Sequence, residues 1–287
     1  MTKIAFLGLG VMGYPMAGHV ARNHQSVAVY NRTMAKAESW ASEHKGIAAP
    51  SIEAAVTDAD IVLMCVGDDP DVEIVAHEAA ANMKPGSILV DHTTASPALA
   101  RALHEEFSKK KIGFVDAPVS GGQAGAENGK LSVMCGGDGP DVEAVRAVME
   151  TYAARIVHIG EAGSGQLCKA VNQICIAGVL QGLAEGVHFA QANALDIDKV
   201  LEAISGGAAQ SWQMENRTKT MAADEFEFGF AVDWMRKDLR IALAEARDAD
   251  ARLPLTALVD QFYGDVQAMG GGRWDTSSLL KRLNKGD

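Results

Sequence analysis

The sequence predicts an α/β domain followed by an all-α domain. Through the first 160 residues, short β-branched runs alternate with alanine-rich helical patterns, which is typical of a sheet covered by helices. After Gly160 the strand pattern stops, and "GSGQLCKAVNQICIAGVLQGLAEGVHFAQANA" begins a long helix that is apolar on nearly every face. The 287 residues exceed the roughly 100–150 of a typical domain. We therefore predict two domains, residues 1–162 and residues 163–287, joined at "EAGSG".

The first domain is predicted to hold seven strands with helices between them. In chain order the strands are "KIAFLGL", "SVAVYN", "DIVLMCV", "SILVDH", "GFVDAPV", "LSVMCGG" and "RIVHIG". Helices are predicted at residues 34–44, "MAKAESWASEH", and at residues 96–110, "SPALARALHEEFSKK". Strands that alternate with helices favour a parallel sheet with helices on both faces.

Charge and cysteine content exclude several classes of protein. The 26 basic and 37 acidic side chains give a net charge of −11, which repels nucleic acid and anionic lipid. The start of the chain shows no signal-peptide pattern, and no run of 18 apolar residues predicts a membrane span. The four cysteines form no CxxC pair, and their apolar surroundings predict buried thiols in a reducing cytoplasm; they are Cys65, Cys135, Cys168 and Cys175. We also find no HExxH or similar spacing and predict no metal site.

The first strand leads into a glycine motif. "GLGVMG" places Gly8, Gly10 and Gly13 in G-x-G-x-x-G spacing between a predicted strand and a predicted helix. Such a turn brings backbone amides close to a pyrophosphate at a helix N-terminus, and a tight strand–helix turn without a ligand is the alternative. The complete context favours a Rossmann-type dinucleotide-binding domain. The candidate cofactor contacts are Gly8, Leu9, Gly10, Val11, Met12 and Gly13, with Cys65 and Val66 at the end of a later strand.

The second strand ends in a segment that predicts the choice of cofactor. Where an NAD enzyme usually has an acid that binds the adenosine ribose, this chain has Asn31, followed by Arg32 and Thr33. A neutral Asn removes the repulsion of a 2′-phosphate, and the Arg32 guanidinium is able to pair with it. We predict NADP, with NAD as a possible second cofactor. The alternative is a solvated loop with an incidental arginine.

A further glycine-rich segment is a candidate carboxylate site. "DAPVSGG" ends in Ser120, Gly121 and Gly122, which offer one hydroxyl and several unobstructed backbone N–H donors. This supply of donors suits a small carboxylate substrate. The alternative is that the two glycines only form a turn.

The long apolar helix carries a polar cluster near its start. Lys169, Asn172 and Gln173 are spaced i, i+3 and i+4, so they share one helical face. Burial would lower the pKa of a lysine, as a general acid in carbonyl reduction requires, whereas a lysine that reaches the surface is the alternative. Lys237, next to Asp238 in "WMRKDLRIALAEA", is a second basic position, for which an exposed, salt-bridged helix face is the usual interpretation.

Taken together, these motifs resemble the β-hydroxyacid dehydrogenase family over essentially the whole chain. The resemblance is carried by "FLGLGVMGYPMA", "DHTTASP", "DAPVSGGQAGAENGKLSVMCGG", "GSGQLCKAVNQ" and "KDLRIALAEA", in the family's order and at its spacing. It implies that Lys169 is the catalytic acid/base, that Ser120 to Gly122 bind the substrate carboxylate, and that Thr94 contacts the cofactor near the nicotinamide. It also implies that Lys237 closes over the cofactor and substrate.

One position departs from the family pattern. Many members have Asn four residues after the catalytic lysine, whereas this chain has Gln173 there and Asn172 one position earlier. Which of the two amides orients the substrate therefore stays open at this point.

The resemblance and the remaining motifs predict a reaction and its substrate class. Hydride passes between a nicotinamide cofactor and a small β-hydroxy acid, and Lys169 takes or returns the hydroxyl proton. Trp212, Phe228 and Phe230 favour a small apolar substituent and hence oxidation of 3-hydroxyisobutyrate to methylmalonate semialdehyde, unless they are ordinary core residues. The predicted NADP preference makes reduction of glyoxylate, succinic semialdehyde or tartronate semialdehyde the alternative.

Two further expectations concern catalysis and assembly. A protein that binds NADP without turnover is the alternative from a different class, but the presence of Lys169 argues against it. The stretch "ICIAGVLQGLA" is more apolar than one small domain is able to bury, so we predict a homodimer or homotetramer with the long helix at the interface.

Overall fold

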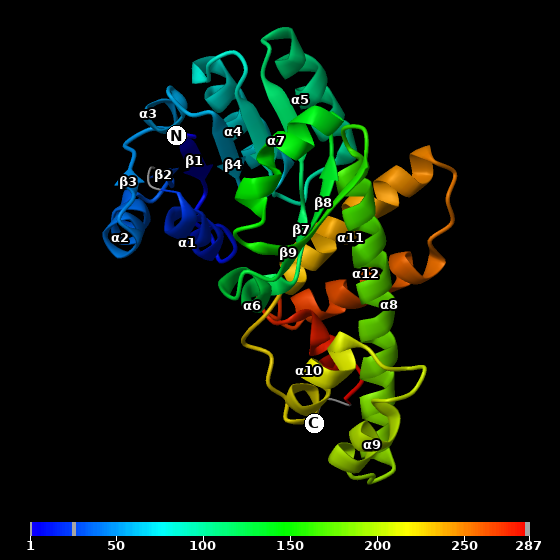
Figure 1. The fold of residues 1–287 in the computed structure, drawn as a ribbon. Coiled ribbons are helices and arrows are strands. Elements are labelled where there is room, and N and C mark those ends of the chain that lie inside the picture. Colours follow the sequence, from blue (N-terminus) through cyan, green and yellow to red (C-terminus); the bar gives the residue numbers. More distant parts are fainter. Residues whose placement is uncertain (1, 25–26, 285–287) are drawn as a thin grey trace. The chain divides into compact units, whose positions relative to one another are not determined.

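The structure is a computed structural model that describes residues 2–24 and 27–284. It divides into two compact units, Met1–Lys169 and Ala170–Asp287. The first unit contains the β-sheet and its helices, and the second is helical (Figure 1). The predicted α/β domain followed by an all-α domain is therefore confirmed.

One sheet runs through the first unit, in the order β3-β2-β1-β4-β5-β6-β8-β7, with β9 paired to β8. The strands are β1 (Ile4–Leu7), β2 (Val27–Tyr30), β3 (Ile47–Ala48), β4 (Ile61–Met64), β5 (Ile88–Asp91), β6 (Gly113–Asp116), β7 (Val119–Ser120), β8 (Leu131–Gly136) and β9 (Ala153–Gly160). Strands β3 to β6 along this order pair in parallel, as a dinucleotide-binding sheet requires.

The far end of the sheet differs from the predicted parallel arrangement. Strand β8 pairs antiparallel with both β6 and β7, and only β9 returns parallel to β8. The reason is the short connection between β7 and β8, residues 121–130, which is too short for a crossover that brings the chain back in parallel. The two-residue strand β3, which the sequence pattern did not predict, pairs with β2 at the opposite edge.

Both faces of the sheet are covered by helices, and two separate apolar cores result. In β1, Ile4 and Phe6 belong to one core, and Ala5 and Leu7 belong to the other. The helices of this unit are α1 (Gly13–Asn23), α2 (Met34–His44), α3 (Ile52–Val56), α4 (Asp69–Asn82), α5 (Pro97–Lys109), α6 (Gly122–Glu127) and α7 (Gly139–Met149). The alternation of side chains along a strand thus explains why the central strands are buried throughout.

The second unit packs around a core of its own, which includes Ala177, Leu180, Ala184 and Val187 on one face of the longest helix. Its helices are α8 (Ser164–Ala192), α9 (Ile197–Ile204), α10 (Trp212–Ala222), α11 (Val232–Asp248), α12 (Pro254–Ala268) and the short 3₁₀ helix η1 (Thr276–Arg282). Helix α8 begins in the first unit and continues into the second. By length and composition alone it could cross a membrane, but core helices of soluble proteins pass the same test.

Five helices end on a non-glycine residue in the left-handed conformation. Lys45 follows α2 with φ of 58°, and Lys111, Ala194, Asp224 and Asp250 have φ between 52° and 61° close after α5, α8, α10 and α11. Glycine is the usual residue for this role at a helix C-terminus, because it carries no Cβ atom.

The predicted burial of all four thiols is wrong. Cys135 is buried, Cys65 and Cys168 are partly exposed, and Cys175 is exposed. Cys175 lies on the face of α8 opposite to the apolar core of the second unit, where the helix is apolar but uncovered. All four cysteines carry free thiols, as predicted.

Candidate active site

The glycine motif forms a tight turn whose outer edge is open. Gly8 has φ of 95°, and its N–H donates to the Tyr30 carbonyl oxygen at 2.9 Å. A Cβ atom at Gly8 would lie 2.2 Å from the Cys65 carbonyl oxygen, and one at Gly13 would lie 2.0 Å from the Gly8 carbonyl oxygen. At Gly10, by contrast, nothing lies within 4 Å of such an atom. The turn therefore fits a pyrophosphate that approaches the backbone near Gly10 at the start of α1.

Asn31 ties the glycine turn to the loop after β2. Its Oδ1 accepts the Leu9 N–H at 3.0 Å, and its Nδ2 donates to the Thr33 carbonyl oxygen at 3.1 Å. Both ends of the amide thus hold the protein's own backbone. The sequence indicated only that an acid is missing here, and the structure adds that Asn31 sets the shape of the loop.

Arg32 extends from this loop, with 89% of its side chain exposed. Its Nη1 lies 3.7 Å from Oδ1 of Asp71 on the first turn of α4. Sequence reasoning missed Asp71, because 39 positions separate it from Arg32. At this distance and exposure the pair is weak, so Arg32 is available to an anion at the cost of little energy.

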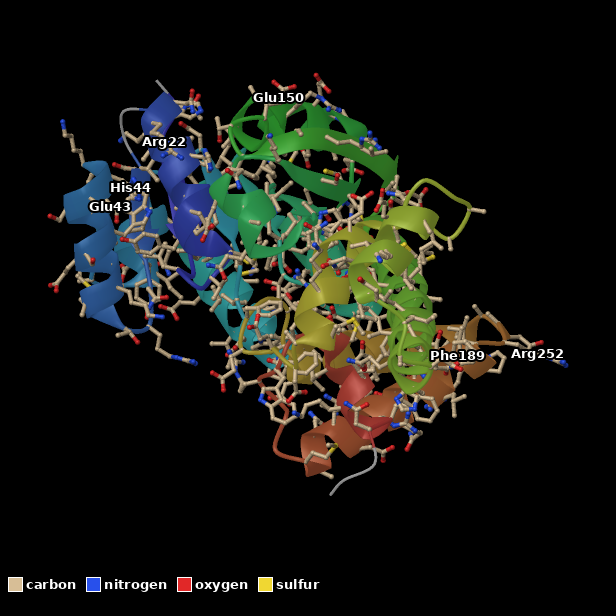
Figure 2. All side chains as sticks on the ribbon, turned by 90° about the horizontal axis from the view of Figure 1, so that it is seen from below. Arg22, Glu43, His44, Glu150, Phe189 and Arg252 are labelled. Atoms are coloured by element: carbon tan, nitrogen blue, oxygen red, sulfur yellow. The ribbon has the colours of Figure 1, made fainter. Side chains whose placement is uncertain are left out.

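Helices α1 and α2, which follow the glycine turn and the Asn31 loop, are joined to each other. The Tyr14 hydroxyl donates to Oε2 of Glu43 at 2.7 Å, and the Trp40 Nε1 donates to the Tyr14 carbonyl oxygen at 3.1 Å. Figure 2 shows Glu43 and His44 on α2 beside Arg22 of α1. Burial lowers the pKa of His44, whose ring packs against Trp40 and Tyr14. These contacts fix the two candidate cofactor-binding segments relative to each other.

The loops after β4 and β5 are also connected. The Val66 N–H donates to Oγ1 of Thr93 at 2.9 Å, and the Thr93 N–H donates to Oδ1 of Asp91 at 2.9 Å. Cys65, Val66 and Thr94, the three cofactor candidates here, are all partly exposed. They follow neighbouring parallel strands, and the carboxyl ends of such strands are where doubly wound sheets bind their ligands.

Asp116, the last residue of β6, is a buried carboxylate that the site prediction did not include. Its Oδ1 accepts the Gly163 N–H at 2.7 Å, and its Oδ2 accepts the Gln166 N–H at 2.9 Å, so it caps the start of α8. Burial raises the pKa of Asp116 to about 6, although these backbone bonds oppose the shift. "DAPVSGG" provides the acid in the sequence, but the contact spans 47 to 50 positions and leaves no local pattern.

The segment Ser120–Gly121–Gly122 connects β7 to α6: Ser120 ends the strand and Gly122 begins the helix. Gly121 and Gly122 have φ of 132° and 60°, so the turn depends on their lack of a Cβ atom. Both are exposed, and Ser120 is partly exposed. The His19 ring of α1 contacts the carbonyl oxygens of Ala126 and Glu127 at 3.1 and 3.0 Å and holds the other end of α6. The backbone amides expected to bind a carboxylate are thus at the surface of a supported turn.

Lys169 is the last residue of the first unit, and only 7% of it is exposed. It lies on α8 three residues after Gln166, whose backbone N–H is held by Asp116. The surface lysine that the sequence left open is therefore not found. A buried lysine close to the carboxyl edge of the sheet is suited to proton transfer.

The second unit holds Asn172 and Gln173. The Gln173 Nε2 donates to Oδ2 of Asp238 at 2.7 Å, and its Oε1 accepts from the Asn172 Nδ2 at 2.7 Å. Gln173 is buried, and Asn172 is only partly buried. Lys237 also pairs with Asp238, at 3.3 Å, and only 16% of its side chain is exposed. Lys237 is therefore not on the exposed helix face that its surroundings in the sequence suggested.

The three aromatic candidates of the second unit are exposed and are not core residues: Trp212 is 54% exposed, and Phe228 and Phe230 are each 36% exposed. The Arg217 guanidinium stacks 4.9 Å from the ring centres of both Trp212 and Phe228. It also pairs with buried Asp275, which accepts the Phe230 N–H at 3.0 Å. Sequence reasoning missed Arg217, although it lies only five residues after Trp212 on the same helix.

Within residues 2–24 and 27–284, no group of three or more His, Cys, Asp or Glu side chains is placed to hold a metal ion.

Two family models together match nearly the whole chain. The NAD-binding domain of 6-phosphogluconate dehydrogenase matches residues 3–160. The NAD-binding domain of NADP-dependent 3-hydroxyisobutyrate dehydrogenase matches residues 163–283.

Individual relatives match over their full length. The chain is 57% identical to an oxidoreductase of Shewanella frigidimarina over 99% of both chains. It is 35% identical to 2-hydroxy-3-oxopropionate reductase of Escherichia coli over 98% of this chain and 97% of the relative. Among solved structures, 3-hydroxyisobutyrate dehydrogenase of Mycobacterium tuberculosis with L-serine has a TM-score of 0.90 at 30% identity, over 99% of this chain and 100% of that one.

Proposed function

Because the chain belongs to the β-hydroxyacid dehydrogenase family of NAD(P)-dependent oxidoreductases, we propose that it oxidises 3-hydroxyisobutyrate to methylmalonate semialdehyde with NADP. The observation that carries this proposal is buried Lys169, near the start of a helix that Asp116 attaches to the carboxyl edge of the sheet. We also propose that residues 1–162 act as the cofactor-binding domain and residues 163–287 as the substrate and assembly domain, in the cytoplasm.

In the proposed reaction, the bound nicotinamide supplies the hydride acceptor. The amides of Ser120, Gly121 and Gly122 bind the substrate carboxylate, and Thr94 supports the nicotinamide end of the cofactor. Lys169 takes the hydroxyl proton during oxidation and returns it during reduction. Lys237 adds a positive charge for the cofactor.

For the amide that orients the substrate, we propose Asn172. The Gln173 donor bonds to Asp238 and its acceptor bonds to Asn172, so its role is to hold these two side chains in place. The partly buried position of Asn172 supports this assignment.

The preference for NADP rests on the charge near Asn31. No carboxylate stands at this position, and Arg32 is exposed with only a weak partner, so a 2′-phosphate meets an available guanidinium.

The proposed substrate rests on the aromatic side chains of the second unit. Trp212 and Phe230 present apolar surface, which suits a methyl substituent. Reduction of glyoxylate, succinic semialdehyde or tartronate semialdehyde is the second candidate, and the relative named 2-hydroxy-3-oxopropionate reductase favours it. Initial rates with 3-hydroxyisobutyrate and with each carbonyl compound, using both cofactors, distinguish the two candidates.

The catalytic part of the proposal is tested at Lys169. We expect Lys169→Ala to lower kcat by about 10²–10⁴-fold, as is typical for loss of a general acid–base group, with NADPH affinity close to that of the wild type. Lys169→Arg should be nearly as inactive, because a guanidinium keeps its charge but does not release its proton near neutral pH. Single-turnover kinetics and NADPH titration measure both quantities. An Arg variant that keeps most of the wild-type kcat contradicts the acid/base role.

A further inference from the structure

Gln166 is a buried polar side chain at the start of α8 with no role in the reaction described above. Only 1% of it is exposed. Its Nε2 donates to the Thr93 carbonyl oxygen at 2.7 Å, and its Oε1 accepts the Ala95 N–H at 3.1 Å. The two ends of one amide thus bond to the backbone on both sides of Thr94, the residue proposed to contact the cofactor. An apolar side chain of the same size would leave both backbone groups buried without a partner.

The backbone of Gln166 is fixed as firmly as its side chain. Its N–H and that of Gly163 donate to the Asp116 carboxylate. The packing around this carboxylate leaves no space for a side chain on either neighbour. A Cβ atom would lie 2.5 Å from Oδ1 of Asp116 at Gly136, and 2.8 Å from Oδ2 at Gly165. The first turn of α8 therefore has one position relative to β6.

The connection continues from Thr93 to the next loop, because the Thr93 Oγ1 accepts the Val66 N–H. The loops after β4, β5 and β6 are thus joined through Thr93, Gln166 and Asp116 to the first turn of α8. All of these residues belong to the first unit. Lys169 follows Gln166 by three positions and therefore lies on the same side of the helix, one turn further on.

We infer that Gln166 is a positioning residue that sets the distance and rotation of Lys169 relative to the Thr94 loop. This inference rests on the proposed function, because it matters for turnover only if Lys169 transfers the proton. Proton and hydride transfer depend on placement within a fraction of an ångström, so a loosened first turn lowers the rate of the chemical step more than it lowers cofactor binding.

The test replaces Gln166 by Met, which conserves volume but removes the donor and the acceptor. We expect kcat to fall about 10- to 100-fold, as small misplacements at an active site do, with the NADPH dissociation constant within about threefold of wild type. The primary isotope effect with 4-deuterated NADPH should rise, because hydride transfer then limits turnover. The matched control is Gln181→Met, which removes a buried amide from the same helix about four turns further on. It should leave kcat unchanged.

A second variant, Gln166→Glu, keeps the shape of the side chain and serves if the Met variant does not fold. A protonated Glu has one O–H donor and one acceptor oxygen, as the bonds to Thr93 and Ala95 require, whereas an ionised Glu has only acceptors. We therefore expect kcat of this variant, divided by that of the wild type at the same pH, to rise as the pH falls from 8 to 6.

The outcomes separate this inference from the proposed function. It is overturned if Gln166→Met keeps kcat within twofold of Gln181→Met, or if the relative kcat of Gln166→Glu does not depend on pH. If Lys169→Ala is inactive in the same assays, the proposed function stands despite that result. If Lys169→Ala is fully active, the proposed function fails, and the inference fails with it.

Discussion

At the scale of single residues, Arg32 and Asp71 determine the charge that a cofactor phosphate would meet. Their side chains lie 3.7 Å apart, 89% of Arg32 and 40% of Asp71 are exposed, and their mutual attraction is therefore at most about 1 kcal/mol. A 2′-phosphate carries more charge than a carboxylate and would compete with Asp71 for the guanidinium. If Arg32 binds the 2′-phosphate as proposed, Asp71 would oppose that binding weakly and Arg32 would support it strongly.

The two residues should have opposite effects on cofactor affinity. We expect Arg32→Ala to weaken NADPH binding by about 1.5–3 kcal/mol, the range for a hydrogen bond to a charged group, and to leave NADH binding nearly unchanged. Asp71→Asn should strengthen NADPH binding by less than about 1 kcal/mol, because it removes only an exposed ion pair. Fluorescence titration with both cofactors measures these changes. Equal losses for NADPH and NADH in the Arg32 variant would argue against the assignment.

His92 makes the fold sensitive to acid. Its ring is buried, with Nδ1 2.7 Å from the Ala117 carbonyl oxygen and Nε2 2.9 Å from the Tyr152 hydroxyl. Burial lowers the pKa of His92 to about 4. The neutral ring therefore stabilises the fold fully at pH values above the ordinary histidine pKa of 6.5. This contribution to the unfolding free energy is lost as the pH falls toward 4.

Replacing His92 should remove this loss of stability at low pH. Between pH 6.5 and pH 4 we expect the wild type to lose at most about 3 kcal/mol of unfolding free energy through His92, whereas His92→Gln should lack this component. Asp116 contributes with the opposite sign, because its raised pKa favours the fold more as the pH falls below about 6. Urea unfolding of the wild type and of His92→Gln at several pH values isolates the contribution of His92 to the unfolding free energy. Parallel curves for the two proteins would show that His92 does not titrate as expected.

Residues that carry a local pattern could be predicted from the sequence, and residues that act over long separations could not. The three glycines of the G-x-G-x-x-G motif lie within six positions, and Lys169, Asn172 and Gln173 lie within five, so each motif forms a local pattern. Gln166 and Thr93 are 73 positions apart, and Asp116 and Gly163 are 47 apart. Only the fold brings such partners together. The Gln166 contact that supports the Thr94 loop and the Asp116 contact that caps α8 therefore leave no signal in the sequence. The roles assigned to the predicted site residues stay predictions.

At the scale of secondary structure elements, two glycines of the β1–α1 turn differ in the space around them. Gly13 has no space for a side chain, because a Cβ atom would overlap the Gly8 carbonyl oxygen. Gly10 has open space where a Cβ atom would lie. Gly13 is therefore required for close packing, whereas Gly10 leaves space that the predicted pyrophosphate would need.

Alanine substitutions should reveal this difference. Gly13→Ala should lower the unfolding free energy by about 1–3 kcal/mol, the usual cost of overpacking. Gly10→Ala should change it by less than about 0.5 kcal/mol, as at an open surface position, but weaken cofactor binding at least tenfold. Thermal unfolding and cofactor titration of the pair measure both effects. Unchanged binding in the Gly10 variant would place the pyrophosphate elsewhere.

The elements themselves were predicted well where the pattern is periodic. Helix α2 covers the predicted residues 34–44. Six of the seven predicted strands contain an observed strand, and the seventh, "RIVHIG", lies within the longer β9. The antiparallel pairing of β8 was not predicted, because it depends on the length of a connection and not on the composition of the strand. Strand β3 has only two residues, too few to show an alternating pattern.

At the scale of the whole molecule, α8 carries an uncovered apolar face. Ala177, Leu180, Ala184 and Val187 are buried in the core of the second unit. On the opposite face, Val171, Val179 and Phe189 are 59%, 40% and 66% exposed. Exposed apolar stripes are typical of protein interfaces, so the homodimer or homotetramer stays a prediction that this face would explain.

Assembly should therefore depend on Phe189. We expect Phe189→Glu to shift the protein toward the monomer in light scattering at micromolar concentration, because it places a charge in an apolar interface. Ile74→Glu is the matched control, since Ile74 is 65% exposed on α4 and does not belong to the stripe. It should leave the oligomer unchanged. A wild type that is monomeric under these conditions contradicts the prediction directly.

The five left-handed residues that end helices have a consequence for how the protein tolerates change. Each non-glycine residue in this conformation costs about 1–2 kcal/mol, partly offset by the lower flexibility of the unfolded chain compared with glycine. Lys45, Lys111 and Ala194 are not among the proposed site residues, so this strain serves no proposed step of catalysis. Substitution by glycine at such positions would supply mutational robustness, which a lineage or an engineer could use to accept destabilising changes at the proposed site residues.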